Sequence, residues 1–316
     1  MDKLPFTVVH YGGKDPRSTT GGVETFARNL ALSFQRVEFM TPRDRDFDRV
    51  RRKRIPVICD NQRVRDWPKD IPVVGFQHGF ATEKAWVTKS PGHLVMATGQ
   101  WLASRRPNTL WVACAEWIAK AFSESFGTRT EEVIYHPIDV ERFDGRLDNH
   151  GSRLILHDGR TRHKGKHLLP KLRDAYPDWT FEPLACKPEE VPDRMRKARA
   201  FIHLSSYEGN SIVCNEAMAM NLPCMFTDVG LMRDSGRPQD VRVISAKRAF
   251  SDARYLHDEL GAFLHSLDTQ SYAPRRWTLA NATAEVALER WARAMDAFFQ
   301  MAGWSPSASR AFLARS

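Results

Sequence analysis

The sequence predicts an α/β protein made of two Rossmann-like domains that face each other across a cleft. Its 316 residues, 42% of them hydrophobic, are enough for about two domains with cores of their own. Short apolar segments alternate with amphipathic ones, as in parallel sheets covered by helices on both faces. This alternation stops at a polar segment, residues 144–152, and then restarts. Ligands of such sheets bind at the carboxyl ends of the strands, so we expect the cleft to hold the site.

The first domain is expected to comprise residues 1–145. Its apolar, β-branched segments predict strands at Phe6–His10, Val37–Met40, Pro56–Cys59, Pro72–Phe76, His93–Ala97, Leu110–Cys114 and Val133–Tyr135. Apolar residues at helical spacing predict helices over Gly22–Phe34 and Glu116–Phe126.

The second domain is expected to comprise residues 151–280. Strands are predicted at Leu154–His157, Trp179–Leu184, Ala200–Leu204, Pro223–Thr227 and Val241–Ile244. Helices are predicted over 165–176, 188–197, from about Ser211, and over Asp252–Leu267. Residues 281–316 are expected to form C-terminal helices that return to the first domain, one over Ala282–Phe299 and another over 306–314.

The composition limits the compartment and the kind of partner. A net charge of +9 favours an anionic partner, which charge alone leaves open as nucleic acid, acidic lipid or a phosphorylated substrate. The five cysteines form no CxxC pair and show no zinc-ligand spacing, as expected of free thiols in a reducing cytoplasm. No segment has the length and apolarity of a signal peptide or a transmembrane helix. We expect a cytoplasmic protein, and peripheral contact with the inner face of the membrane stays open.

The segment after Leu204 carries the most chemical information. Glu208 follows a predicted strand, and Glu216 lies on the helix after it. Between them lie the residues that open this helix, Gly209, Asn210, Ser211 and Ile212. The free N–H groups and the dipole of a helix start attract phosphate.

The spacing of the two glutamates fits a sugar nucleotide. From Ser211 to Glu216 a helix rises about 7.5 Å, so the phosphate-binding N–H groups would lie between the two carboxylates. One carboxylate would then meet sugar hydroxyls and the other ribose hydroxyls. The competing interpretation is that both glutamates are simply solvated, and that one of them interacts favourably with the helix dipole.

Two cations follow the first strand of the second domain. Arg160 and Lys164 would lie at the carboxyl end of Leu154–His157, where they could neutralise a diphosphate leaving group. The neighbouring Arg162 and Lys166 keep a simple solvated basic loop open as an alternative.

The first domain offers one histidine and two glycines. His78 follows closely on the predicted strand Pro72–Phe76 and would face the cleft. Gly21 and Gly22 would let backbone N–H groups approach a diphosphate. A structural histidine and a flexible turn are the plainer interpretations of these residues.

Five segments together resemble a known family. They are Gly21-Gly-Val-Glu-Thr-Phe, Phe76-Gln-His-Gly79, Val133-Ile-Tyr-His-Pro-Ile-Asp139, Asp158-Gly-Arg160 with Lys164-Gly165, and the Glu208-x7-Glu216 segment with Ala-Met-Ala-x-x-x-Pro. In this order they resemble the retaining glycosyltransferases of family 4, which have the GT-B fold. One departure is His136, which stands where that family usually has Asn.

The resemblance implies roles for the residues already singled out. It implies transfer of a hexosyl or pentosyl group from a nucleotide diphosphate sugar, a UDP-sugar being favoured, with retention and with neither a metal nor a cofactor. Glu208, His78, Arg160 and Lys164 would be catalytic. The donor would be bound by Glu216 and by Gly21, Gly22, Gly209, Asn210, Ser211 and Ile212. A catalytically inert sugar-nucleotide binding protein, or a glycogen-type or epimerase activity, remains an alternative on the same fold.

The acceptor is expected to be anionic, because cations accumulate in the first domain, above all over Arg43–Arg54. A glycan or glycolipid is favoured by the family, and modified DNA of the bacteriophage type is the alternative. The DxD-like pair Asp44 and Asp46 would suit a metal-dependent transferase, but it lies among arginines that it could merely balance.

Overall fold

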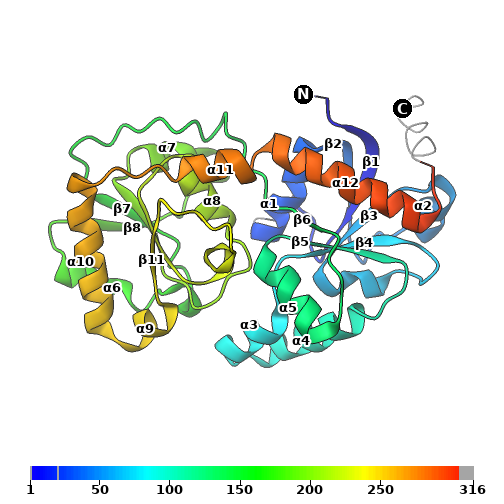
Figure 1. The fold of residues 1–316 in the computed structure, drawn as a ribbon, viewed down its shortest axis with the longest axis horizontal. Helices are drawn as coiled ribbons and strands as arrows, with labels where there is room; N and C mark the ends of the chain where they lie inside the picture. Colours follow the sequence, from blue (N-terminus) through cyan, green and yellow to red (C-terminus); the bar gives the residue numbers. More distant parts are fainter. Residues whose placement is uncertain (1, 20, 306–316) are drawn as a thin grey trace. The chain divides into compact units, whose positions relative to one another are not determined.

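The computed structural model describes residues 2–19 and 21–305 (Figure 1). By its internal contacts the chain divides into two units, one drawn from residues 1–137 and 284–316 and the other from 138–283. Each unit contains one parallel sheet flanked by helices, which confirms the predicted fold class of two Rossmann-like domains. The cleft between the domains stays a prediction.

Unit 1 contains a six-stranded parallel sheet in the order β2-β1-β3-β4-β5-β6. Its strands are β1 (Leu4–Tyr11), β2 (Phe34–Met40), β3 (Val57–Asp60), β4 (Val73–Gln77), β5 (Thr109–Ala113) and β6 (Glu132–Val133). Its helices are α1 (Gly22–Asn29), α2 (Phe47–Lys53), α3 (Ala81–Thr88), α4 (Pro91–Ala103), α5 (Glu116–Phe126) and α12 (Ala284–Ala302). Strands β1, β3 and β4 are neighbours, so the residues that follow them meet at one edge of the sheet.

The strand predicted at His93–Ala97 is wrong, because these residues lie within helix α4. Pro91 occupies the first turn of this helix, where its missing N–H costs nothing. A short apolar run fits a strand and a helix equally well, and here the large side chains Leu94 and Val95 face solvent while Ala97 packs inward.

Helix α12 completes the core of unit 1. Trp291 is fully buried, and its ring lies 5.3 Å from that of Phe34 and 5.9 Å from that of Phe76. Phe299 packs edge-on against Phe6 at 5.2 Å. The sheet of unit 1 is therefore partly covered by α12, which begins at Ala284, whereas the last strand of the sheet ends at Val133.

Unit 2 contains a five-stranded parallel sheet in the order β11-β10-β9-β7-β8. Its strands are β7 (Leu154–His157), β8 (Thr180–Pro183), β9 (Ala200–His203), β10 (Cys224–Thr227) and β11 (Arg242–Ile244). Its helices are α6 (Leu169–Ala175), α7 (Val191–Arg196), α8 (Ile212–Ala219), α9 (Ala246–Ser251), α10 (Ala253–Thr269) and α11 (Arg275–Asn281). The order places the ends of β7, β9 and β10 side by side.

The polar segment 144–152 is held against unit 2. Asn149 donates to the carbonyl of Ala198 at 2.6 Å, and Ser152 donates to that of Lys197 at 2.8 Å. None of the helices in the described part of the chain is long and apolar enough to cross a bilayer. The helix predicted over 306–314 lies outside the described residues.

Candidate functional site

A charged cluster lies at the carboxyl ends of β7 and β9 in unit 2. Asp158, the first residue after β7, is buried and accepts hydrogen bonds from both flanking cations. Arg160 Nε and Lys164 Nζ each lie 2.6 Å from its carboxylate oxygens. Lys164 is also 3.3 Å from the carboxylate of Glu208. Three residues that the sequence singled out, Arg160, Lys164 and Glu208, therefore belong to one network around Asp158.

A glycine allows Lys164 to take this position. Lys164 ends a short 3₁₀ helix, and Gly165 follows it with φ of +74°, a conformation that disfavours a side chain. A Cβ on Gly165 would also lie 2.7 Å from the carbonyl oxygen of Leu204 at the end of β9. The loop after β7 can therefore pack directly on the loop after β9, which brings Lys164 to Glu208.

Glu208 is held by a buried histidine, His203. His203, the last residue of β9, lies with Nε2 3.1 Å from Glu208 Oε1, and the Ser205 hydroxyl donates to the same oxygen at 3.3 Å. Burial opposes a charge on Glu208, but the hydrogen bond and charge of His203 and the charge of Lys164 outweigh it and lower the pKa of Glu208 to about 2. Glu208 is therefore an anion.

His203 carries the matching positive charge. Burial disfavours the imidazolium, but the sulfur of Cys214 and the carboxylate of Glu208 favour it and raise the pKa of His203 to about 10. Protonated His203 donates from Nε2 to Glu208. Counting Arg160 and Lys164, three cations surround the two carboxylates Asp158 and Glu208, so the edge of the sheet is left with an excess of positive charge.

Helix α8 begins beside this cluster with its first N–H groups uncapped. Ser211 is at the N-cap position, and its side chain makes no capping hydrogen bond. Ile212 is the first helical residue, and Gly209 and Asn210 form the turn before it. The amide groups of this first turn have no partner within the helix and can bind an anion.

Glu216 lies one turn further along α8, and its pKa is shifted in the opposite direction to that of Glu208. Burial raises its pKa to about 7, with the charge of Arg142 acting against the rise and that of Asp158 adding to it. Among residues 2–19 and 21–305, no group donates a hydrogen bond to its carboxylate. Glu216 is therefore a partly buried acceptor that a hydroxyl-bearing ligand could satisfy.

Unit 1 has its own cluster at the carboxyl ends of β1, β3 and β4. Asp60, the last residue of β3, is buried, and its Oδ1 lies 3.0 Å from Nε2 of His10 and 2.8 Å from Nε2 of His78. Burial raises the pKa of Asp60, but the two imidazoles outweigh it and hold that pKa well below its usual range. An ionised carboxylate can only accept, so both histidines carry their proton on Nε2.

Aromatic contacts connect this cluster to helix α1. The ring of Phe26 lies 4.8 Å from that of His78, and His136 stacks on His78 at 5.7 Å. Burial and the neighbouring His78 hold the pKa of His136 well below its usual value, so His136 stays neutral. Gly21 and Gly22 form the start of α1, one turn before Phe26. The structure therefore places Gly21, Gly22 and His78 within the same region of unit 1.

The Asp44 and Asp46 carboxylates serve local structure. Asp44 accepts from the backbone N–H of Thr41 at 2.6 Å, and Asp46 caps α2 by accepting from the N–H of Arg49 at 2.9 Å. Within the described part of the chain, no group of three or more His, Cys, Asp or Glu side chains could hold a metal ion.

Sequence reasoning missed the residues that hold the predicted ones in place. These residues are His10 and Asp60 in unit 1 and Asp158 and His203 in unit 2. The sequence analysis named Asp158 only within one of the five segments that resemble the family, and gave it no role. Each lies at or just after the carboxyl end of a strand, a position that the predicted strands already marked.

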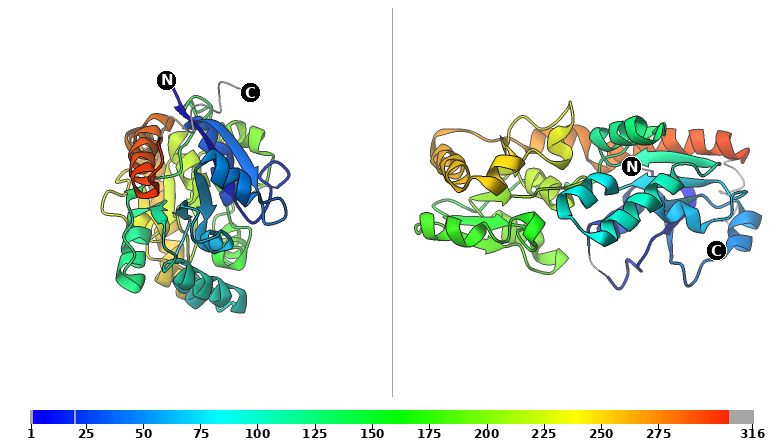
Figure 2. Two further views of the ribbon diagram at one scale, coloured as in Figure 1. Left: turned by 90° about the vertical axis from the view of Figure 1, so that its right-hand side faces the viewer. Right: turned by 90° about the horizontal axis from the view of Figure 1, so that it is seen from below.

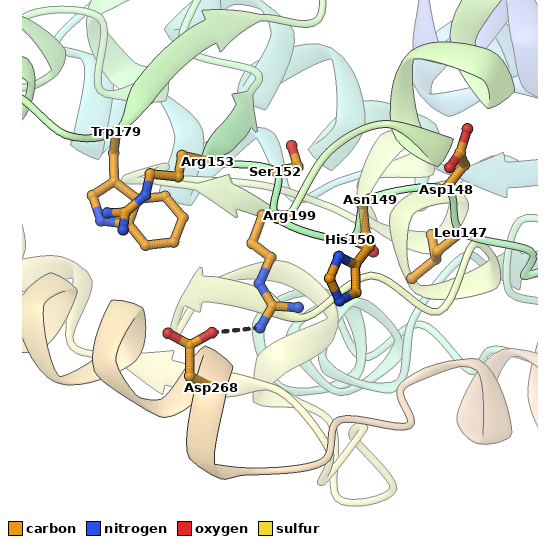
Figure 3. A pocket seen from close by; sticks show the side chains of 10 residues that line it. Leu147, Asp148, Asn149, His150, Ser152, Arg153, Trp179, Arg199 and Asp268 are labelled. Carbon is orange, nitrogen blue, oxygen red and sulfur yellow. Dashed lines mark hydrogen bonds and ion pairs between the residues drawn. The ribbon is translucent and has the colours of Figure 1, made fainter.

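A hollow in unit 2 lies at the opposite edge of its sheet (Figure 3). It has a volume of about 460 Å³ and is lined by residues 147–153, Trp179, Arg199 and Asp268. Arg199 is paired with Asp268 at 2.8 Å, as Figure 3 shows. Apart from Asp268 on α10, these residues precede β7, β8 and β9, whereas ligands of parallel sheets bind beyond the carboxyl ends. We therefore assign the site to the charged cluster and the start of α8.

The fold and this site define a class: proteins with two Rossmann-like domains of the GT-B type. Structural similarity at low identity shows that fold and no more. Sucrose-phosphate synthase of Thermosynechococcus elongatus matches with a TM-score of 0.69 and 13% identity over 93% of this chain and 99% of that one. HepE of Anabaena, in complex with UDP and glucose, matches with a TM-score of 0.69 and 13% identity, over 92% of this chain and 100% of HepE. A glycosyltransferase of Rickettsia africae ESF-5 matches with a TM-score of 0.65 and 11% identity, over 95% of this chain and 99% of that one.

The sequence itself identifies the second unit more closely. Residues 180–260 match the model of the family described as glycosyl transferases group 1. The matched segment includes Glu208, the start of α8 and Glu216. No curated protein matches the chain. The chain therefore has the GT-B fold, and a segment of its second unit matches the model of the group 1 glycosyl transferases.

Proposed function

We propose that the protein transfers a glycosyl group from a nucleotide diphosphate sugar to an acceptor, with retention of anomeric configuration and without a metal ion. The observation that carries this proposal is the meeting of Lys164, Arg160 and the uncapped start of α8 at one strand edge. In the proposed reaction the bond from the sugar C1 to the diphosphate breaks and the diphosphate leaves with the electron pair. The acceptor oxygen bonds to C1, and its proton passes to the departing diphosphate.

Each group at this edge has a role that its environment suits. Lys164 and Arg160 stabilise the negative charge that develops on the diphosphate, and the first N–H groups of α8 bind its oxygens. Glu208, held as an anion, accepts hydrogen bonds from hydroxyls of the donor sugar. Glu216, which lacks a donor in the described chain, accepts from the ribose. His78 and the Gly21–Gly22 backbone contact the transferred sugar or the adjoining phosphate from unit 1.

A UDP-sugar donor and a glycan or glycolipid acceptor are the favoured substrates. HepE, which has a similar fold, is described in complex with UDP-glucose at 14% identity. WaaB, at 11% identity and a TM-score of 0.58, is described as a lipopolysaccharide outer core galactosyltransferase. These descriptions concern the two similar proteins, and they support the substrate classes that we propose here. Modified DNA is the alternative acceptor, and the experiments below compare it with glycans and glycolipids.

A thermal-shift screen of the purified protein against UDP-, GDP-, ADP- and dTDP-sugars tests the donor. A ligand that binds the folded state at 100 times its Kd adds about 2.7 kcal/mol of stability. We expect one nucleotide series to raise Tm in the presence of EDTA, and the same donor to be hydrolysed slowly without an acceptor. Glu216→Gln should lose most of the shift, whereas Glu285→Gln on the exposed face of α12 should keep it.

The alternatives give different results. A Tm shift with neither hydrolysis nor transfer would identify an inert sugar-nucleotide binding protein. Strict dependence on Mg²⁺ or Mn²⁺ would contradict the metal-free mechanism. Transfer to hydroxymethylated duplex DNA, and to no glycan or glycolipid in a panel, would replace the favoured acceptor with DNA.

A further inference from the structure

Helices α3 and α4 of unit 1 expose more large apolar side chains than the rest of the described chain together. Trp86 is 74% exposed, Leu94 63% and Val95 73%, and Trp101 and Leu102 are exposed as well. The two helices pack on each other and form a small layer at the surface of unit 1, drawn in cyan in Figures 1 and 2. Isolated exposed apolar residues are ordinary, but a concentration on one pair of helices indicates an interaction surface.

The apolar residues of α4 lie on one face. At 100° per residue, Leu94, Val95, Trp101 and Leu102 fall within one third of the helix circumference. The opposite face consists of small or polar residues that pack inward, Ala97, Gly99, Gln100 and Ala103.

The inner face has small residues for a structural reason. A Cβ on Gly99 would lie 3.2 Å from the side chain of Gln62, so the helix approaches that segment closely. Gln100 is buried, donates to Gln77 and Gly79 and accepts from the N–H of Ala81, which anchors the loop after β4. Internal packing therefore explains the small face of α4, and it leaves the large apolar face unexplained.

Cations accompany the exposed tryptophans. Lys89 Nζ lies 3.7 Å from the centre of the Trp86 ring, and the Arg105 guanidinium lies 3.9 Å from that of Trp101. No acidic residue occurs from Lys84 to Ala115. By contrast, the arginines of α2 meet acids, since Arg49 pairs with Glu38 and Arg51 with Asp70.

We propose that the exposed face of α3 and α4, defined by Trp86, Leu94, Val95, Trp101 and Leu102 with Lys89 and Arg105, docks on an anionic lipid bilayer. Tryptophan is favoured at the membrane–water interface, where its ring is partly in hydrocarbon and partly in the headgroup layer. Lysine and arginine beside it are attracted by acidic headgroups.

The charge on this surface favours a bilayer over a second copy of the chain. A two-fold symmetric dimer pairs a surface with itself, so the cations of one copy would face the same cations of the other. Glu83 is the single carboxylate on α3 and α4 has none, which is too few to compensate Lys84, Lys89 and Arg105. An anionic bilayer supplies the missing negative charge over the whole face.

Co-sedimentation with vesicles tests the proposal, and it needs neither donor nor acceptor. We expect the wild-type protein to bind vesicles of equal parts phosphatidylcholine and phosphatidylglycerol, and to bind phosphatidylcholine alone much more weakly. Binding should weaken as NaCl is raised, because salt screens the headgroup charge. Brominated phosphatidylglycerol should quench tryptophan fluorescence, and Trp86→Phe/Trp101→Phe should remove most of the quenching.

Variants separate the apolar and the charged contributions. Trp86→Ser/Leu94→Ser should weaken binding at least tenfold, because two exposed apolar side chains no longer enter the bilayer. Lys89→Glu/Arg105→Glu should weaken it by about fivefold or more for each cation lost. The matched controls Leu279→Ser and Lys247→Glu change an exposed apolar and an exposed cationic side chain on unit 2 and should bind as wild type does. All six positions face solvent, so Tm should not change.

Two results would overturn the proposal. One is the absence of wild-type binding to the anionic vesicles at low salt. The other is a dimer in analytical ultracentrifugation that Trp86→Ser/Leu94→Ser converts to monomer while vesicle binding is unchanged, which would assign the face to a second copy of the chain. Neither result would bear on sugar-nucleotide binding by unit 2, because the Tm screen measures that separately.

Discussion

The two units hold polar clusters at equivalent edges of their sheets, and the clusters differ in charge. In unit 1, a single buried carboxylate, Asp60, is shared by two imidazoles, His10 and His78. In unit 2, two carboxylates are surrounded by three cations, and the pKa of His203 is raised to about 10. The edge of unit 2 therefore keeps its positive charge throughout the neutral range. The edge of unit 1 depends instead on two imidazoles that share one buried carboxylate.

This difference indicates a division of labour. A fixed positive edge beside an uncapped helix suits a diphosphate, which is anionic in both substrate and product. A histidine held in one orientation by a buried carboxylate suits a group that must meet a neutral sugar. Four predictions test whether the difference matters, beginning with the largest expected effect.

Replacing Lys164 with Ala should lower kcat on the order of 10²-fold, as removal of one preorganised electrostatic stabiliser does. Arg160→Ala should lower it too. Steady-state kinetics with the donor found in the Tm screen measures both. Lys166→Ala is the matched control, because this exposed lysine lies two residues away and should leave kcat unchanged. Normal turnover in Lys164→Ala would mean that the positive charge at the strand edge of unit 2 has no special role in catalysis.

Replacing Asp60 with Asn should lower kcat about tenfold and cost about 1–3 kcal/mol of stability, because a buried hydrogen-bonding partner of two imidazoles is altered. Asp60 acts here as a positioning residue for His78, so the pH profile of kcat should shift as well. Urea unfolding and a pH series give the two readouts. Asp66→Asn, which alters a partner of Tyr11 instead, should leave the pH profile as it is. A loss of stability with an unchanged profile would reduce Asp60 to a structural role.

Nucleotide affinity should depend on pH through Glu216, whose pKa is raised to about 7. Only the ionised carboxylate accepts hydrogen bonds from both ribose hydroxyls, so affinity should fall as pH decreases through 7. Isothermal titration calorimetry from pH 6 to pH 8.5 measures the change, which should be several-fold. Glu216→Gln should bind weakly at every pH, and a wild-type affinity that is flat with pH would contradict the assignment.

The smallest effect concerns stability at alkaline pH. The pKa of His203 is about 10 when folded, against about 6.5 for an unperturbed histidine. A raised pKa stabilises the fold below the unfolded value, and this contribution is lost as pH rises from about 6.5 through about 10. NMR titration of the His203 ring should show the high pKa in the wild type and a lower one in Glu208→Gln. An unchanged His203 pKa in that variant would mean that Glu208 does not hold its charge.

The sequence by itself determined the two α/β units and the neighbourhoods of the predicted site. Alternating apolar and amphipathic segments predicted all strands of both sheets to within a few residues, because strand and helix periodicities are local properties. The one false strand, His93–Ala97, failed because a run of four apolar residues, Leu94 to Ala97, fits either period. Its true structure is a helix whose large side chains face outward, which local pattern could not reveal.

Only the tertiary structure decided which side chains meet. His10, Asp60 and His78 come from β1, β3 and the end of β4, and they meet because the strand order makes these strands neighbours. His203 looked like an ordinary strand residue until the chain placed Glu208 beside it. Strand order and loop packing follow from the burial of the whole core, whereas a motif records only what is adjacent along the chain. The sequence therefore named most groups of the candidate site, and the fold supplied the partners that fix their charges.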